Sequence, residues 1–173
     1  MRPSLGVIAD THGDGAAWEK ACRVWGPVSG ILHCGDVLSA EPSDLVEKIR
    51  RAGCPVLIVR GNCDTRRTEE RLGLPLLSPY AVIWWYDKLV LMGHGDRFPY
   101  LRQLGLAWRA HVVITGHTHV GSVVREEGTI FLNPGSASLP RGRDPASAAR
   151  IDGEGIRIFT VASDETLHWE PWQ

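Results

Sequence analysis

Seven side chains that can bind a divalent metal ion occur in five short blocks of this sequence. Two of the blocks hold a pair of ligands, Asp10-Thr11-His12 and Gly116-His117-Thr118-His119. The full set combines carboxylate, amide and imidazole groups: Asp10, His12, Asp36, Asn62, His94, His117 and His119. Such a mixture of oxygen and nitrogen ligands suits Mn, Fe, Ni, Co or Zn better than Mg or Ca.

The number of ligands predicts two metal ions, because seven side chains are too many for one. Two ions about 3.5–4 Å apart, bridged by a carboxylate, can hold a hydroxide and neutralise the oxygens of a phosphoryl group. Glycines adjoin the ligands at Gly35, Gly61, Gly93 and Gly116, where they allow tight turns close to a substrate. These features indicate phosphoryl displacement by hydrolysis.

The elements that must position these ligands are short apolar runs, each followed by one of the blocks. Their length and composition predict buried strands at residues 5–9, 30–34, 55–59, 88–92 and 112–115. In open α/β sheets, functional sites lie beyond the carboxyl ends of the strands. We therefore expect the five loops that carry the ligands to converge at one place.

The remaining pattern predicts an α/β domain with a pair of mixed sheets. Helical spacing is found at residues 14–25, at Pro42–Arg51 (with Glu41 and Ser43 as cap candidates) and at 99–109. Strand–helix–strand units of this length favour a parallel core in the first half. Predicted antiparallel strands follow in the second half, at residues 81–85, 122–125, 129–132, 148–151, 156–161 and 166–169.

The order of the five blocks resembles the motif series of the calcineurin-like metallophosphoesterases. The similarity spans residues 5–136 and includes Asn133-Pro134-Gly135-Ser136. The chain length and the block Gly61-Asn62-Cys63-Asp64 are similar to those of the small YfcE-type phosphodiesterases. Each block alone is a weak signal, but five in order, each after a strand-like run, are specific.

The resemblance implies a four-layer β-sandwich of two mixed sheets flanked by helices, in a single domain over residues 1–173. It also implies direct attack by a hydroxide that bridges two divalent ions, with Mn expected and Ni, Co, Fe or Zn as alternatives. The implied ligands are Asp10, His12 and His119 for the first ion, Asn62, His94 and His117 for the second, and Asp36 for both.

The catalytic candidates are Asp36, Asn62 and His94, with Cys63 as a further one. Many members of the family carry a histidine at the position of Cys63, where it helps to protonate the leaving group. A thiol is a poorer acid, so catalysis here depends on a good leaving group or on another donor. This departure and the resemblance together favour a diester substrate.

Several other polar residues receive structural interpretations. Asp14 is expected to cap the first helix, and Asn133 and Ser136 are expected to build a turn near the site. For three arginines a solvated charged surface is favoured over contact with substrate phosphate: Arg66, Arg67 and Arg97. The histidines expected to be structural are His33, His111 and His168.

Composition limits the partners that we expect. The net charge of -1 argues against general binding to nucleic acids or membranes. No signal peptide and no apolar run of 18 residues is found, and the four cysteines form no CxxC pair, so the expected compartment is the cytoplasm. The expected partners are a small phosphate ester and further copies of the chain, as a dimer or larger, since Trp84 or Trp85 should face outward.

Three functions are consistent with this pattern. The first is a metal-dependent phosphodiesterase, and the second is a phosphomonoesterase or pyrophosphatase that uses the same site. The third is a non-catalytic, protein-binding scaffold of the retromer-subunit type. A scaffold need not keep a full ligand set, so the presence of all seven ligands disfavours it.

Overall fold

The computed structural model describes residues 3–39 and 43–173. Its helices are α1 (Gly15–Trp25), α2 (Leu45–Arg50), α3 (Arg66–Leu72) and α4 (Phe98–Ala107). Its strands are β1 (Leu5–Ile8), β2 (Gly30–His33), β3 (Val56–Ile58), β4 (Ala81–Trp85), β5 (Lys88–Met92), β6 (Val112–Ile114), β7 (Gly121–Glu126), β8 (Thr129–Pro134), β9 (Ser147–Ile151), β10 (Gly155–Thr160) and β11 (Thr166–Pro171).

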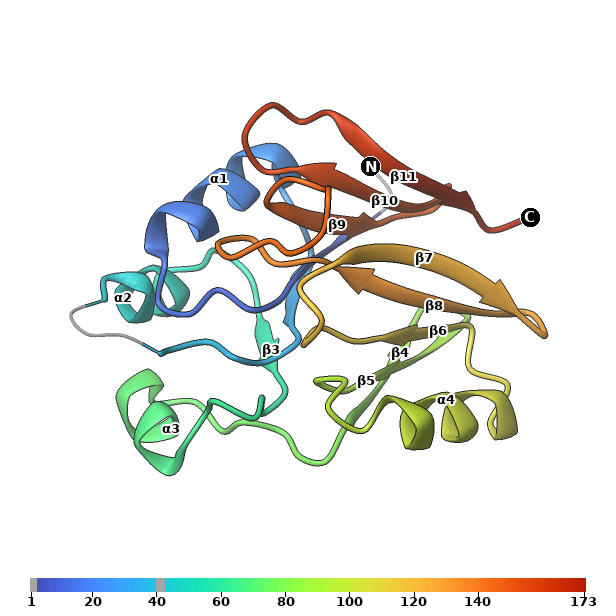
Figure 1. Cartoon of the computed structure of the whole chain (residues 1–173), viewed down its shortest axis with the longest axis horizontal. Coiled ribbons are helices and arrows are strands. Elements are labelled where there is room, and N and C mark those ends of the chain that lie inside the picture. The colour runs from blue at the N-terminus through green and yellow to red at the C-terminus, as the bar shows by residue number, and fades with distance from the viewer. Residues whose placement is uncertain (1–2, 40–42) are drawn as a thin grey trace.

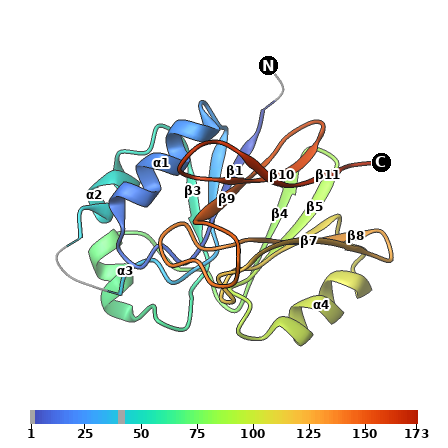
Figure 2. The same cartoon turned by 45° about the horizontal axis from the view of Figure 1, so that its top comes forward.

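The strands form two mixed sheets that pack face to face. The first sheet has the order β11-β10-β9-β1-β2-β3 and the second the order β4-β5-β6-β8-β7. Helices α1, α2 and α3 lie on one side of the molecule and α4 on the other, with the sheets between them (Figures 1 and 2). This arrangement confirms the predicted four-layer fold.

Each sheet contains a parallel group of three strands, β1-β2-β3 in the first and β5-β6-β8 in the second. The other neighbours in both sheets are antiparallel. Four of these pairs join consecutive strands and were predicted as antiparallel, whereas the pairing of β9 with β1 was not predicted. The strands of each parallel group run in the same direction, so their carboxyl ends lie side by side at one end of the sheet. The loops that leave these ends carry the predicted ligands.

Apolar side chains on both faces of the central strands explain why their sequences read as short continuous runs. Leu5 and Val7 of β1 face the space between the sheets, where they pack with Val90 and Ile114 of the second sheet. Ile8 faces α1 and α2 instead. On the other side of the molecule α4 covers the second sheet with side chains that include Leu101.

Helix α1 begins as predicted, because the Asp14 carboxylate accepts a hydrogen bond from the Ala17 amide at 2.9 Å. Trp25 at its other end is buried, and its indole N–H donates to the Ala149 carbonyl at 2.7 Å. The hydrogen bond therefore fixes the end of the helix against β9.

Helix α2 is shorter than the sequence predicted. It begins at Leu45, after the N-cap residue Asp44, whereas the predicted start, Pro42, and the cap candidate Glu41 lie outside the described residues. The Ser43 hydroxyl accepts a hydrogen bond from the Leu45 amide at 3.2 Å, so this cap candidate does contact the first turn.

The sequence analysis did not predict α3. Only Thr68 and Leu72 of its seven residues are buried, so its sequence carries no apolar stripe. Thr65 and Thr68 instead start the helix by reciprocal hydrogen bonds between side chain and backbone.

Candidate metal centre

The predicted ligands all follow the carboxyl ends of parallel strands. Asp10 and His12 follow β1, Asp36 follows β2 and Asn62 follows β3 in the first sheet. In the second sheet His94 follows β5, and His117 and His119 follow β6. The structure brings these seven side chains together, as the sequence predicted for the loops.

One group of ligands consists of Asp10, His12 and His119. The Nε2 atoms of His12 and His119 lie 3.4 Å apart, and His119 Nε2 lies 3.6 Å from Asp10 Oδ1. Ligands that share one ion at bond lengths of 2.0–2.2 Å stand about 3.0–3.5 Å from each other. The spacing of this group therefore fits a shared ion.

The second group consists of Asn62, His94 and His117. The Asn62 Oδ1 atom lies 2.9 Å from His94 Nε2 and 2.9 Å from His117 Nδ1, and the two ring nitrogens are 3.2 Å apart. These distances also fit ligands of one ion. Both His117 and the exposed Asn62 reach this group from loops at the edge of their sheets.

Asp36 lies between the two groups. Its Oδ2 atom is 3.5 Å from His94 Nε2 of the second group. Its carboxylate also lies within ligand distance of Asp10 and of His12 in the first group. The other oxygen, Oδ1, accepts a hydrogen bond from the Cys63 amide at 2.8 Å, which orients the carboxylate.

The backbone of these loops is bent rather than extended. Five of the ligands have a positive φ: Asp10 (51°), His12 (47°), Asp36 (55°), His117 (71°) and His119 (63°). Residues other than glycine adopt this conformation at a cost of about 1–3 kcal/mol each, and such strain concentrates at functional sites. The bent loop therefore aims the His117 and His119 side chains.

Two glycines allow the loops to approach one another. A Cβ atom on Gly61 would lie 2.1 Å from Asp36 Oδ1, and one on Gly35 would lie 2.7 Å from the Gly61 amide nitrogen. Gly35 also has a φ of 91°. A side chain at either position would separate Asp36 from the loop that carries Asn62.

Hydrogen bonds fix the orientation of three of the histidine rings. The Nδ1 atom of His94 donates to the Cys34 carbonyl at 2.7 Å, and Nδ1 of His119 donates to the Leu139 carbonyl at 2.7 Å. His12 Nδ1 contacts the Ser39 hydroxyl. Since Nδ1 holds the proton in His94 and His119, their Nε2 atoms keep a free lone pair for a metal ion.

Asp64 is a residue of the site that the sequence analysis did not single out. It is 7 % exposed, and its carboxylate accepts hydrogen bonds from the amides of Asp36 (2.8 Å), Val37 (3.0 Å) and Gly61 (2.9 Å). It therefore ties the loop after β2 to the loop after β3. Its signal in the sequence was its position, two residues after the candidate ligand Asn62 and three after Gly61.

His33 has the structural role that the sequence predicted. It is fully buried, and its Nε2 lies 2.9 Å from the Thr11 hydroxyl, which donates to the Val37 carbonyl at 3.1 Å. Burial lowers the pKa of His33 to about 3, so the ring is neutral. It links the loops after β1 and β2.

Asn133 and Ser136 build a turn beside the site, as predicted. The Asn133 amide donates to the Gly116 carbonyl at 2.7 Å and to the Thr118 hydroxyl at 3.0 Å. The Ser136 hydroxyl donates to the Asp10 carbonyl at 2.7 Å. These contacts hold the histidine loop and the backbone of Asp10 against the end of β8.

The charge of the site favours a cation. Burial, together with the nearby charge of Asp36, raises the pKa of Asp10 to about 8. Asp10 Oδ1 is buried and has no hydrogen-bond partner in the described chain, although Oδ2 accepts one from the His117 amide at 3.0 Å. A buried carboxylate oxygen without a partner, beside two imidazoles, fits a metal ligand.

We expect the affinity for Mn²⁺ to rise about tenfold per pH unit between pH 6 and 8 and to level off above 8. A carboxyl group whose pKa is about 8 holds a proton at pH 7, and the metal must displace it. Burial lowers the pKa values of His12 and His119, which favours the neutral rings, so we assign the competing proton to Asp10.

Isothermal titration in two buffers that differ in ionisation enthalpy would measure this effect. About one proton should be released per protein at pH 7 as the metal binds. An affinity that is constant from pH 6 to 8 would contradict the prediction.

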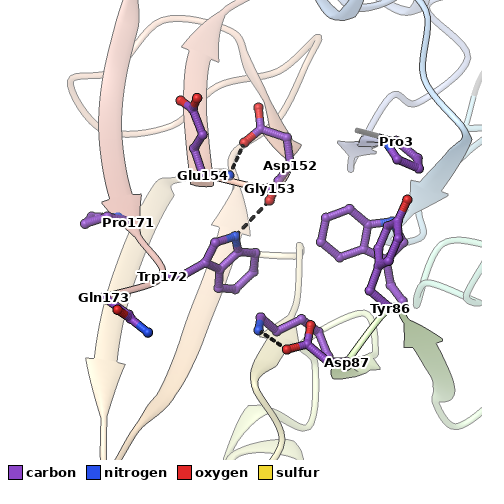
Figure 3. A pocket seen from close by; sticks show the side chains of 11 residues that line it. Pro3, Tyr86, Asp87, Asp152, Gly153, Glu154, Pro171, Trp172 and Gln173 are labelled. Atoms are coloured by element: carbon purple, nitrogen blue, oxygen red, sulfur yellow. Dashed lines mark hydrogen bonds and ion pairs between the residues drawn. The ribbon is translucent and has the colours of Figure 1, made fainter. Parts of the chain in front are cut away.

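A separate cavity of about 590 Å³ lies at the amino ends of β1 and β5, away from these loops. Figure 3 shows its lining, which includes Tyr86 and Asp87 of the turn between β4 and β5. Lys88 pairs with Asp87 at 3.0 Å and lies 5.2 Å from the centre of the Trp172 ring. None of the predicted ligands lines this cavity.

Two mixed sheets that bring candidate metal ligands together at the ends of their parallel strands are consistent with a metal-dependent phosphoesterase. The sequence model for the calcineurin-like phosphoesterase superfamily domain matches residues 4–155, and the chain belongs to this family. It is therefore a hydrolase of phosphoric esters, and the family uses divalent metal ions. No helix among the described residues is long and apolar enough to span a membrane.

Particular relatives agree with this assignment. The chain is 28% identical over 181 residues to phosphodiesterase YfcE of Escherichia coli K12, covering 94% of each chain. It is 35% identical over 162 residues, 88% of each chain, to a probable metallophosphoesterase of Methanothermobacter thermautotrophicus.

Two solved structures share the fold. The structure of YfcE matches with a TM-score of 0.83 at 22% identity, over 98% of this chain and 100% of that one. Vps29 of Entamoeba histolytica, in complex with Zn²⁺, matches with a TM-score of 0.72 at 20% identity, over 98% and 99%.

Proposed function

We propose that this protein is a phosphodiesterase that hydrolyses a small phosphodiester at a centre of two divalent ions. The observation that carries the proposal is the division of the ligands into two groups that share Asp36. The mixed nitrogen and oxygen ligands favour Mn²⁺, with Ni, Co, Fe or Zn as alternatives. The metal would supply the charge that activates water and neutralises the phosphoryl oxygens.

The protein's own residues position these groups. Asp10, His12 and His119 would hold one ion. Asn62, His94 and His117 would hold the second ion. Asp36 would serve both. Hydrogen bonds to the rings and carboxylates keep the ligands in place, so that little reorganisation is needed when substrate binds.

Cys63 supports the choice of a diester with a good leaving group. Burial raises the pKa of its thiol to about 11, and a hydrogen bond from the thiol to Asp36 adds to this. The thiol therefore stays protonated but is a weak acid, unsuited to assist an unreactive leaving group near neutral pH. The name of YfcE as a phosphodiesterase agrees with this choice.

We expect the Mn²⁺-loaded protein to hydrolyse bis(p-nitrophenyl) phosphate about tenfold faster, in kcat/KM, than p-nitrophenyl phosphate, which corresponds to about 1.4 kcal/mol. Both assays release p-nitrophenolate and would be run with Mn²⁺, Ni²⁺ and Mg²⁺ in turn. Faster turnover of the monoester with every metal would instead assign the site to a phosphomonoesterase.

A protein that bound no metal at saturating Mn²⁺ would favour the scaffold alternative. The full ligand set disfavours that alternative, because a scaffold has no need of seven ligands oriented in this way. The Vps29 likeness shows the shared fold only.

We also propose that the chain forms a dimer or a larger oligomer. Strand β4 is an edge strand of the second sheet, and it exposes Trp84 (68 %) and Val82 (47 %). Open strand edges with apolar side chains pair readily with another copy. Light scattering after gel filtration would measure the mass, and a monomer at micromolar concentration would contradict the proposal.

A further inference from the structure

Two cavities of about 290 Å³ each adjoin the candidate metal centre. Asn62 lines the first cavity and Cys63 the second, so one loop separates them. Asn62 contacts His94 of the second ligand group, whereas Ser39, which also lines the second cavity, contacts His12 of the first group. Each cavity therefore lies beside a different group of ligands.

This arrangement suits a phosphodiester. A diester carries two organic arms on one phosphorus, and a monoester carries only one. A phosphoryl group held between the two ligand groups would have a cavity beside it for each arm. The volume of each cavity is at the small end of the range for ligand pockets, which limits an arm to about one ring system and a sugar.

The charges around the first cavity, which we call the Asn62 cavity, nearly balance. Its lining residue Arg60 forms an ion pair with Glu69 at 2.6 Å, and Arg97 lies next to Asp96 in the chain. A second phosphate on the arm would require surplus positive charge. The balance therefore favours an arm without a net charge.

The side chains that remain available in the Asn62 cavity suit a planar ring. Tyr100 is 49 % exposed, and its ring contacts Tyr80 at a centroid distance of 6.5 Å. Arg97 is exposed, and its guanidinium forms no hydrogen bond or ion pair with the residues that the structure describes. Aromatic rings and guanidinium groups both stack on nucleobases.

We propose that the Asn62 cavity binds a nucleoside arm of the substrate, with the base against Tyr100 and Arg97. Asp96 and Ser78 also line this cavity, and their side chains would accept hydrogen bonds from the sugar. The inference rests on the proposed function. Water would add to phosphorus, the ester bond to the other arm would break, and that arm would leave as an alcohol with one proton from the water. The product would be a nucleoside monophosphate.

The test compares two substrates with the Mn²⁺-loaded protein. Thymidine 5′-(p-nitrophenyl phosphate) and methyl p-nitrophenyl phosphate have the same leaving group, but only the first carries a nucleoside. We expect kcat/KM for the thymidine substrate to be at least about tenfold higher. Tyr100→Ala and Arg97→Ala should each lower this ratio several-fold, mainly through KM. Trp84→Ala, which removes an exposed aromatic ring elsewhere, should leave the ratio unchanged.

Binding of thymidine 5′-monophosphate, measured by calorimetry, provides a readout that does not depend on turnover. Weaker nucleotide binding by Tyr100→Ala than by Trp84→Ala would support a nucleoside site in the Asn62 cavity, whether or not the diesters are hydrolysed. Failure to hydrolyse either diester would refute only the proposed function. A substrate ratio near one in the unmodified protein, or equal nucleotide binding by both variants, would overturn the inference. Retained melting temperatures would show that the variants are folded.

Discussion

Replacement of Asp36 by asparagine is expected to lower kcat/KM for a phosphodiester by about a thousandfold or more while the protein stays folded. In the proposed centre Asp36 is the one carboxylate that serves both ligand groups. Loss of a shared anionic ligand removes several kcal/mol of transition-state stabilisation, and about 1.4 kcal/mol corresponds to each factor of ten.

The fold should tolerate this substitution for two reasons. Asparagine is among the residues that best accept a positive φ, which is 55° at this position. Its side-chain carbonyl can also accept the hydrogen bond from the Cys63 amide that Asp36 Oδ1 now accepts at 2.8 Å. The melting temperature of the metal-free variant should therefore match that of the unmodified protein.

Asp87→Asn is a suitable matched control, since Asp87 is exposed in the turn between β4 and β5 and is remote from the ligands. Its rates should equal those of the unmodified protein. The measurement is hydrolysis of bis(p-nitrophenyl) phosphate at saturating Mn²⁺, together with the number of bound ions. Unmodified rates in Asp36→Asn would remove Asp36 from the proposed bridging position.

Replacement of Asp64 by alanine should destabilise the metal-free protein by about 3 kcal/mol or more, because three buried amides would lose their acceptor and each costs at least about 1 kcal/mol. Two of these amides belong to Asp36, itself a candidate ligand, and to Gly61, the neighbour of the candidate ligand Asn62. We therefore also expect activity to fall by about 10–100-fold in protein that remains folded.

Asp64→Asn provides a graded comparison. The side-chain carbonyl of asparagine can replace Asp64 Oδ2, which accepts hydrogen bonds from the amides of Asp36 and Gly61. The side-chain NH2 of asparagine would replace Oδ1 and could not accept the hydrogen bond from the Val37 amide. The loss of stability should thus be about 1–3 kcal/mol, between the unmodified protein and Asp64→Ala. Urea denaturation measures the series, and an unchanged midpoint for Asp64→Ala would contradict the proposed role.

The sequence by itself determined which residues to consider as ligands and where they lie along the chain. Ligand chemistry depends on residue type, and a strand end is marked by a local apolar run that stops at a polar residue. Asp10, Asn62 and His94 could be chosen on this basis, and the strands at residues 81–85 and 88–92 could be placed in the same way. The order of the five blocks then pointed to the family, which the comparisons show.

Only the tertiary structure decided how these residues meet. The contacts that distinguish the two ligand groups join residues far apart in the chain, such as His12 and His119, so local patterns carry no record of them. Asp64 was missed because its three partners lie in two different loops. Helix α3 was missed because it buries few side chains. The burial, hydrogen bonds and charges of these residues depend on which loops lie next to one another. The packing of the two sheets determines which loops do so.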